Sequence, residues 1–235
     1  MFGDPYVFLV TAVFLIPAAL VAIPVHEMAH ALAAQWQGDP TPRNRGFLRY
    51  DPRLFIEPYG LIAVFLAKVA WGQPVPINEY RLRGVWGRVG YAVAGPGGNL
   101  LVAIVSGIAL RALLGTGAVI DQASLVQTPV GYVAFIVYAI FFLNLSTFAF
   151  NLLPIPGLDG WRILEALFRH RNARFFFDAN MRRREIWMVA VLVVFVASFL
   201  GYRLLAVVLI PFFAPASDAI VGQCLGYYGL LPCPG

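Results

Sequence analysis

The chain has 235 residues, of which 60% are hydrophobic and only 12% are charged. This composition lies outside the usual range of soluble domains, and the many Trp, Tyr and Phe residues are typical of a protein of the lipid bilayer. It excludes a disordered chain. With only two cysteines, the chain also lacks the residues for a secreted disulfide-rich fold or a four-cysteine zinc site.

Four apolar runs are long enough to cross a membrane, which takes about 20 residues in a helix. In chain order they are Tyr6–Gln35, Arg88–Leu114, Val130–Leu153 and Ile186–Phe213. A shorter run, Leu61–Trp71, is predicted to be a re-entrant or interfacial segment. We therefore expect an all-α membrane protein with about four transmembrane helices.

The stretch from Pro40 to Pro58 is expected to form short β-strands at the cytoplasmic face of the membrane. Its four prolines deny it a continuous helix. Between them lie apolar and aromatic side chains that favour strands, namely Phe47, Leu48, Tyr50, Leu54, Phe55 and Ile56.

The arginines predict the orientation of the helices. Most of the basic residues lie after the first run, before the second, or between the third and the fourth. The positive-inside rule places these segments in the cytoplasm and both termini outside it, as in a multi-pass protein of the bacterial plasma membrane. The net charge of +5 is thus explained by topology and by contact with lipid headgroups. The sequence has no basic stripe interleaved with exposed aromatics, so it does not indicate nucleic-acid binding.

The first apolar run ends in the sequence His26-Glu27-Met28-Ala29-His30. Residues four apart lie on one face of a helix, so both imidazoles can bind one metal ion while Glu27 holds a water molecule beside it. The plain alternative is a set of polar side chains that snorkel to the membrane interface. Ionisable groups at membrane depth cost at least about 2.5–3.5 kcal/mol each, and a divalent cation would offset that cost. Pro17 and Pro24 predict a bend or local opening just before the cluster.

Two histidines leave a catalytic zinc site one protein ligand short. Glu57, Asp159 and Glu165 are the acids that do not fall in obvious loops. Asp159 directly follows the third run, which is predicted to be parallel to the first, so the end of that run and the histidine pair should meet at one level. This topology favours Asp159 as the third ligand.

These motifs resemble those of the site-2 protease family of intramembrane zinc metalloproteases, over about residues 20–165. The matching pieces are His26-Glu27-Met28-Ala29-His30, Pro74-Val75-Pro76-Ile77-Asn78, Ala94-Gly95-Pro96-Gly97-Gly98-Asn99 and Asn151-Leu152-Leu153-Pro154-Ile155-Pro156-Gly157-Leu158-Asp159-Gly160. The resemblance implies that His26, His30 and Asp159 bind one zinc ion and that Glu27 is the catalytic base. It also implies that the enzyme cleaves a transmembrane protein substrate within the membrane, near the cytoplasmic side.

The sequence also predicts the domain organisation. We expect a single integral-membrane domain with a catalytic core at about residues 6–165, an extra transmembrane helix at about residues 186–213, and no PDZ or other soluble domain. Many family members have an aspartate where this chain has Glu57, which leaves the role of Glu57 open.

Two asparagines are candidates for holding the substrate backbone. Asn99 follows a run of small residues that is expected to mediate close helix contact, and a buried amide in hydrocarbon needs partners. Asn151 lies just before the prolines that precede Asp159. Cys224 and Cys233 fall on the outer side, where a disulfide is permitted.

Two other functions remain open on the sequence. A membrane metal transporter or zinc-sensing protein would need further ligands along a path, and the outer halves of the spans offer almost none. A catalytically silent scaffold that binds transmembrane helices would have no use for Glu27 beside two metal ligands.

Overall fold

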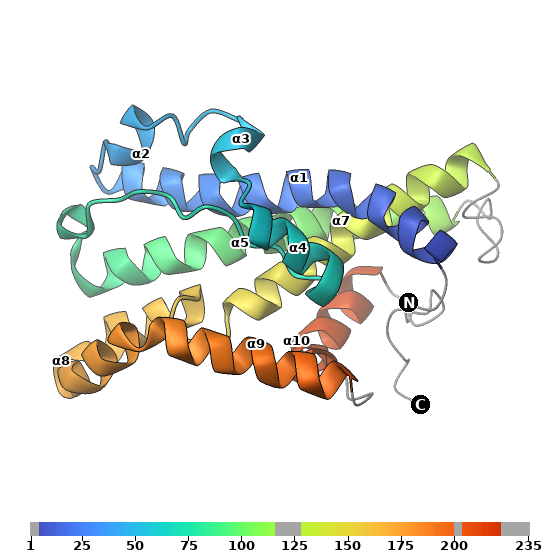
Figure 1. Ribbon diagram of the computed structural model, residues 1–235. Coiled ribbons are helices and arrows are strands. Elements are labelled where there is room, and N and C mark those ends of the chain that lie inside the picture. Colours follow the sequence, from blue (N-terminus) through green and yellow to red (C-terminus); the bar gives the residue numbers. More distant parts are fainter. Residues whose placement is uncertain (1–4, 116–127, 200–203, 222–235) are drawn as a thin grey trace.

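The computed structural model describes residues 5–115, 128–199 and 204–221, in which all regular structure is helical (Figure 1). The elements in chain order are α1 (Pro5–Trp36), α2 (Thr41–Asn44), α3 (Pro52–Phe55), α4 (Pro58–Ala67), the 3₁₀ helix η1 (Glu79–Arg81), α5 (Gly84–Gly115), α7 (Pro129–Asn151), α8 (Asp159–Met181), α9 (Arg183–Phe199) and α10 (Leu204–Val221). The all-α prediction is confirmed for this part of the chain.

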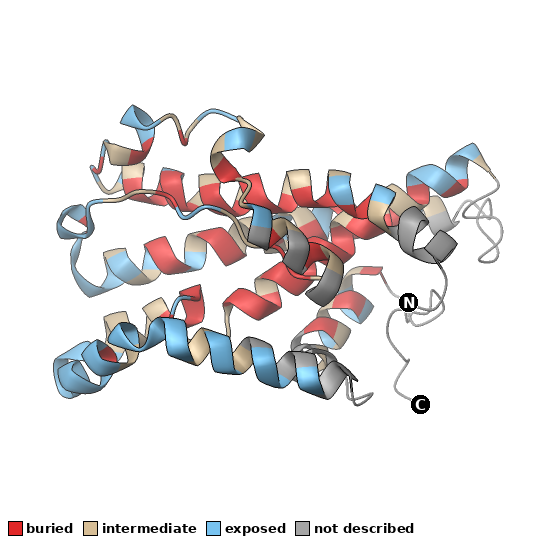
Figure 2. Cartoon of the chain, viewed as in Figure 1, coloured by how far each residue is buried: buried red, intermediate tan, exposed pale blue. Residues whose placement is uncertain are grey.

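Three long helices, α1, α5 and α7, form the centre of the fold. α1 and α7 run in the same direction and α5 runs the opposite way (Figure 1). Each contains an apolar stretch long enough to cross a membrane: Ala12–Trp36, Gly84–Leu113 and Pro129–Asn151. These are the first three predicted spans, and α7 is the most deeply enclosed (Figure 2).

The predicted fourth span, Ile186–Phe213, is not confirmed as a single crossing. Its described residues belong to two helices, α9 and α10, which take different directions in Figure 1. Arginines and a glutamate occupy the start of α9, and Pro211 and Pro215 interrupt the backbone hydrogen bonds of α10. α10 packs against α5 and α7 through Phe213 and Val221.

The strands expected between Pro40 and Pro58 are also not confirmed. This segment contains the short helices α2 and α3, and no strand occurs among the described residues. A proline stands in the first turn of each helix, where its fixed φ angle fits and its missing N–H is not needed. Phe47 and Phe55 meet edge to face, with ring centroids 5.5 Å apart, and pack against α1. The apolar side chains that favoured strands therefore anchor a helical segment instead.

The short apolar run predicted at Leu61–Trp71 begins as α4, whose 10 residues are too few to cross a bilayer. The chain then returns towards the end of α1 through an irregular segment, Gly72–Asn78. The backbone N–H of Gln73 donates to the carbonyl of Phe55 over 2.8 Å. At the other end, the N–H of Asn78 donates to Asp39 Oδ2 over 2.7 Å. The Gly72–Asn78 segment is thus fastened at both ends.

Asp39 is the polar link between the end of α1 and this segment. It is fully buried, and its Oδ1 accepts hydrogen bonds from the backbone N–H and the hydroxyl of Thr41. Burial on its own raises the pKa of a carboxyl group. The hydrogen bonds from Thr41 and Asn78, with the positive charge of Arg81, outweigh it and hold the pKa of Asp39 below its ordinary value.

This lowered pKa makes the contribution of Asp39 to stability dependent on pH. A carboxyl group whose pKa is lower in the folded state stabilises the fold above its unfolded pKa of 3.8 and loses that effect as the pH falls through the folded pKa. We expect Asp39→Asn to lower the thermal midpoint in detergent by about 3–6 °C at pH 7, with a smaller difference near pH 3. A difference from the wild type that does not change between pH 7 and pH 3 would contradict this prediction.

Candidate metal centre

His26 and His30 lie one turn apart on the same face of α1 and are both buried. The helix just before them is altered by Pro24, which has no N–H to donate to the carbonyl of Leu20. That carbonyl instead accepts a hydrogen bond of 2.6 Å from the Tyr50 hydroxyl. The proline therefore frees a backbone acceptor that holds the α2–α3 segment against α1.

Helix α5 fixes the orientation of the first imidazole through Asn99. His26 Nδ1 lies 2.7 Å from Asn99 Oδ1. The amide nitrogen of Asn99 donates to the carbonyl of Ala22 over 3.0 Å and to Asn144 Oδ1 over 2.9 Å. Because that nitrogen faces two acceptors, the oxygen of Asn99 faces His26, and Nδ1 of His26 is the donor.

The second imidazole is oriented by the backbone of α5. His30 Nδ1 lies 2.8 Å from the carbonyl oxygen of Tyr91, which can only accept a hydrogen bond. The ring of Tyr91 lies against the imidazole, with centroids 4.8 Å apart. Nδ1 of His30 therefore carries a proton, and in the neutral imidazole Nε2 has a free lone pair.

The two helices can approach this closely because Gly95 lies where they meet. A Cβ atom at Gly95 would overlap the Nε2 atoms of both imidazoles. Gly98 lies against Val25 and Ala29 of α1 in the same way. The expectation of close helix contact through these small residues is confirmed, and Gly95 in addition leaves room for the imidazole nitrogens.

Asp159 reaches the same place from the start of α8. The prolines after α7 end that helix, and Gly157 turns the chain with a φ angle of +105° that favours glycine. Gly160 then packs so closely on the carbonyls of Leu152 and Leu153 that no Cβ would fit. The carboxylate of Asp159 is buried in the first turn of α8, where the helix dipole favours a negative charge.

The structure brings His26, His30 and Asp159 together, with their ligand atoms all within 4.8 Å of one another. Asp159 Oδ2 lies 3.1 Å from Nε2 of each histidine, and the two Nε2 atoms are 3.2 Å apart. With both Nδ1 protons directed at α5, these electron-rich atoms require protons or a cation among them. Ligand atoms about 2.1 Å from a tetrahedral zinc ion are about 3.4 Å apart, so the donor set and its spacing fit zinc.

Glu27 lies beside this group and is also buried. Its Oε2 accepts a hydrogen bond of 3.2 Å from the backbone N–H of Val75, in the Gly72–Asn78 segment. Pro74 and Pro76, on either side of Val75, have no N–H to donate. Sequence reasoning missed this contact and that of the Tyr91 carbonyl, because a backbone group leaves no signal in residue type.

The other predicted site residues have partners within the protein. Asn99 is fully buried, and its oxygen and its nitrogen both bond protein groups, so a contact with the substrate backbone stays a prediction. Asn151 donates to the Thr147 carbonyl of its own helix over 3.0 Å. Glu57 accepts a hydrogen bond of 3.1 Å from the Trp71 indole. Cys224 and Cys233 lie outside the described residues.

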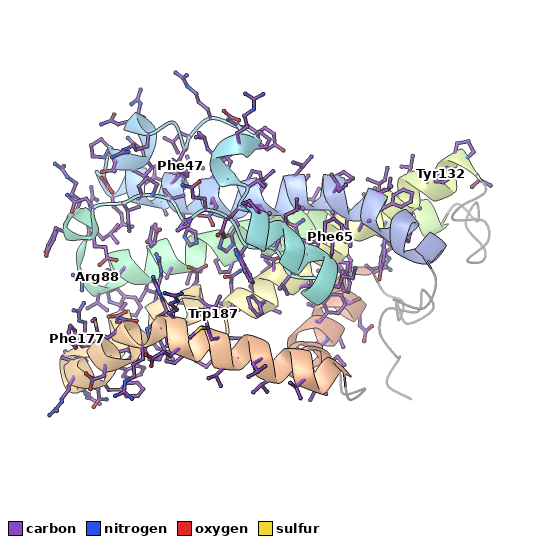
Figure 3. The ribbon with its side chains drawn as sticks, viewed as in Figure 1. Phe47, Phe65, Arg88, Tyr132, Phe177 and Trp187 are labelled. Atoms are coloured by element: carbon purple, nitrogen blue, oxygen red, sulfur yellow. The ribbon has the colours of Figure 1, made fainter. Side chains whose placement is uncertain are left out.

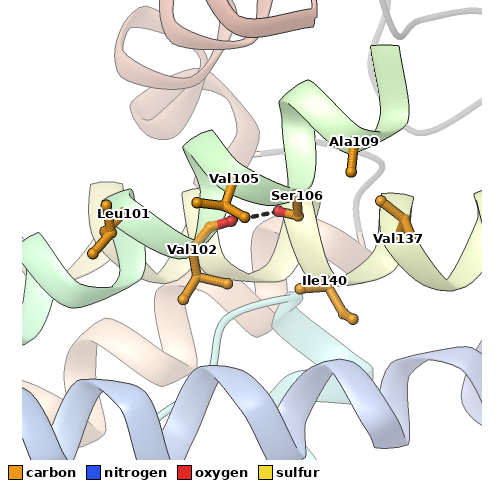
Figure 4. A pocket seen from close by; sticks show the side chains of 7 residues that line it. All are labelled: Leu101, Val102, Val105, Ser106, Ala109, Val137 and Ile140. Carbon is orange, nitrogen blue, oxygen red and sulfur yellow. Dashed lines mark hydrogen bonds between the residues drawn. The ribbon is translucent and has the colours of Figure 1, made fainter. Parts of the chain in front are cut away.

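An apolar pocket of about 370 Å³ lies further along α5, between this helix and α7 (Figure 4). Its lining includes Leu101, Val105 and Ile140, and none of the metal-site residues. The hydroxyl of Ser106 is the one polar side-chain group of this lining, and it bonds the Val102 carbonyl of its own helix over 2.6 Å. The pocket therefore offers no group for chemistry.

The sequence profile of peptidase family M50 matches residues 14–198 of the chain. This match includes the histidine pair, the segment at Val75, the small residues of α5 and Asp159.

Individual relatives agree with this match. The chain is 32% identical to "Putative zinc metalloprotease YwhC" of Bacillus subtilis (strain 168) over 169 residues, which cover 66% of this chain and 68% of that protein. It is also 32% identical to "Putative zinc metalloprotease Rip2" of Mycobacterium tuberculosis (strain H37Rv) over 195 residues, which cover 80% of this chain and 69% of the relative. No solved structure gives a significant match.

The bond from His26 to Asn99 can be tested by metal affinity. We expect Asn99→Ala to weaken zinc binding by about 10- to 100-fold, because His26 loses the partner that fixes its ring. Asn144→Ala, which leaves the His26 contact in place, should have a smaller effect. The measurement is competition for zinc with a chelator of known affinity, and Ser106→Ala on the same helix is the control. Equal affinity in Asn99→Ala and Ser106→Ala would show that the amide does not orient His26.

Proposed function

The chain belongs to peptidase family M50, the site-2 protease family, and we propose that His26, His30 and Asp159 hold its zinc ion while Glu27 acts as the catalytic base. The protein is an integral membrane zinc metalloprotease that acts within the bilayer. The observation that carries the residue assignment is the convergence of three buried ligand atoms from two separate helices.

The chemistry of these residues follows from their positions. Bound zinc supplies Lewis acidity, which polarises a peptide carbonyl and makes water a stronger acid. Glu27 Oε2 is held by Val75, so we assign proton transfer to Oε1. In this assignment Oε1 takes a proton from the attacking water and passes it to the leaving amine. The buried surroundings keep both transfers apart from bulk water.

The depth of the site supports cleavage near one membrane face. His30 lies six residues before the end of α1, which corresponds to about 9 Å along the helix. The arginines of the segments after α1, before α5 and in α8 all belong to this end of the bundle. We therefore place this end in the cytoplasm, with both termini outside it, in the plasma membrane of a bacterium.

A substrate helix must become extended before its peptide bonds can reach the site, because helical side chains and hydrogen bonds shield the backbone. The segment between Pro40 and Pro58 contains the helices α2 and α3, so it offers no strand edge with which an extended substrate could pair.

The decisive experiment compares zinc content with proteolysis in Glu27→Gln. The variant should retain one zinc ion per chain and cleave a single-span test substrate at least about 100-fold more slowly than the wild type, because the amide cannot accept the proton. Glu185→Gln, on exposed α9, is the matched control and should cleave normally. Normal cleavage by Glu27→Gln would exclude Glu27 as the base. A metal transporter would instead move zinc into vesicles whichever residue occupies position 27.

The hydrogen bond from Val75 to Glu27 makes a second prediction. Val75→Pro removes the N–H that holds Oε2 of Glu27. Val75→Ala keeps this N–H but also loses the packing of the valine side chain, so it serves as the matched control. We expect Val75→Pro to lower kcat by about tenfold or more relative to Val75→Ala, with zinc content unchanged in both. If the two variants have the same kcat, the N–H of Val75 does not position the base.

A further inference from the structure

Helix α8 is not one straight helix. Asn172 has non-helical angles, φ −133° and ψ 43°, and the chain turns there. The second part folds back on the first, so that Trp161 donates from Nε1 to Asn180 Oδ1 over 2.8 Å and lies 5.0 Å from the ring of Phe176. Asn180 also donates to Glu165 over 3.1 Å. We call residues 159–181 the α8 hairpin.

The outer surface of this hairpin combines positive charge with exposed apolar side chains. Residues 168–184, which include the junction with α9, contain six arginines and one aspartate, all of them exposed. One of the arginines, Arg169, is 3.7 Å from Glu165. Among these residues four large apolar side chains are also exposed, namely Phe168, Phe175, Phe177 and Met181. A surface that faced only water would not favour this exposure of phenylalanine rings beside arginines.

The position of the hairpin explains the combination. It lies at the end of the bundle where α1 ends and α5 begins, and Phe177 points outward there (Figures 1 and 3). The exposed apolar face of α9 begins at Met188, just after Arg182, Arg183 and Arg184. Arginines that precede a lipid-facing helix mark the level of the headgroups. Phe177 precedes Arg183 by only six residues, across the junction between α8 and α9, so its exposed ring lies close to that level along the chain.

We propose that the outer surface of the α8 hairpin binds the headgroups of anionic phospholipids in the surrounding bilayer. The guanidinium groups pair with lipid phosphates, and the phenylalanine rings enter the boundary between headgroups and acyl chains. A soluble polyanion would use the arginines alone and would gain nothing from Phe177 or Met181. Because α8 begins with Asp159, the same contact anchors the helix that carries the third proposed metal ligand.

Hydrogen–deuterium exchange of the full chain in nanodiscs tests this proposal. One set of discs contains phosphatidylcholine alone, and the other also contains phosphatidylglycerol. We expect the amides of residues 168–184 to exchange about tenfold more slowly in the anionic discs, since each basic residue near an anionic surface adds to binding. Exchange at the same rate in both lipids overturns the proposal. Zinc content and proteolysis do not enter this readout, so the result is independent of the catalytic assignment.

Matched variants separate the roles of charge and of the rings. Arg171→Gln with Arg174→Gln removes two of the six arginines and should clearly reduce the anionic protection of residues 168–184. Arg43→Gln with Arg45→Gln, two exposed arginines near α2, should leave it intact. Phe177→Ser tests the ring at a position with an exposed side chain and should reduce the protection. Protection that stays at the wild-type level in Arg171→Gln with Arg174→Gln contradicts lipid binding at this surface. Protection at the wild-type level in Phe177→Ser would show that the arginines act alone, which contradicts the proposal that the rings also bind the lipid.

Discussion

Each histidine of α1 donates its Nδ1 proton to α5, and the rest of the site depends on these two hydrogen bonds. With Nδ1 engaged, Nε2 of His26 and of His30 can face only each other and Asp159. In hydrocarbon such a cluster of acceptors is costly unless something positive lies between them. The three acceptor atoms therefore suit a cation, and in this buried place only a cation or bound protons can offset the cost of bringing them together.

Close packing and polar bonding support one another at this contact. Gly95 lets α5 approach the imidazoles, and only at that separation do Asn99 and the Tyr91 carbonyl reach the Nδ1 atoms. Asn99 is itself held by Ala22 of α1 and Asn144 of α7, so its amide joins the three central helices. A larger residue at position 95 would thus act on the metal site by separating helices, although it is no ligand.

Much of this site could be predicted from the sequence, since the spacing of His26 and His30 and the parallel course of α1 and α7 bring Asp159 to one level with them. The backbone contacts of Tyr91 and Val75 could not, because every residue type has an N–H and a carbonyl. The strands expected between Pro40 and Pro58 are not confirmed for a different reason. Apolar and aromatic side chains favour a strand, but the prolines of α2 and α3 also suit the first turn of a helix, and Phe47 and Phe55 of this helical segment pack on α1.

The predicted fourth span shows that composition alone does not determine how many helices an apolar run forms. Residues 186–213 are apolar except for Arg203, yet an apolar run of this length does not specify whether it forms one helix or two. α9 contacts the site region near its start, where Trp187 donates to the carbonyl of Pro156 over 2.8 Å and its ring lies 5.9 Å from that of Trp71. Beyond that point the exposed face of α9 is apolar, as a lipid-facing helix requires (Figures 2 and 3). Trp187 therefore ties a lipid-facing helix to the loop that leads to Asp159. Together with the α8 hairpin, it makes the position of this proposed ligand depend on how the membrane holds both helices.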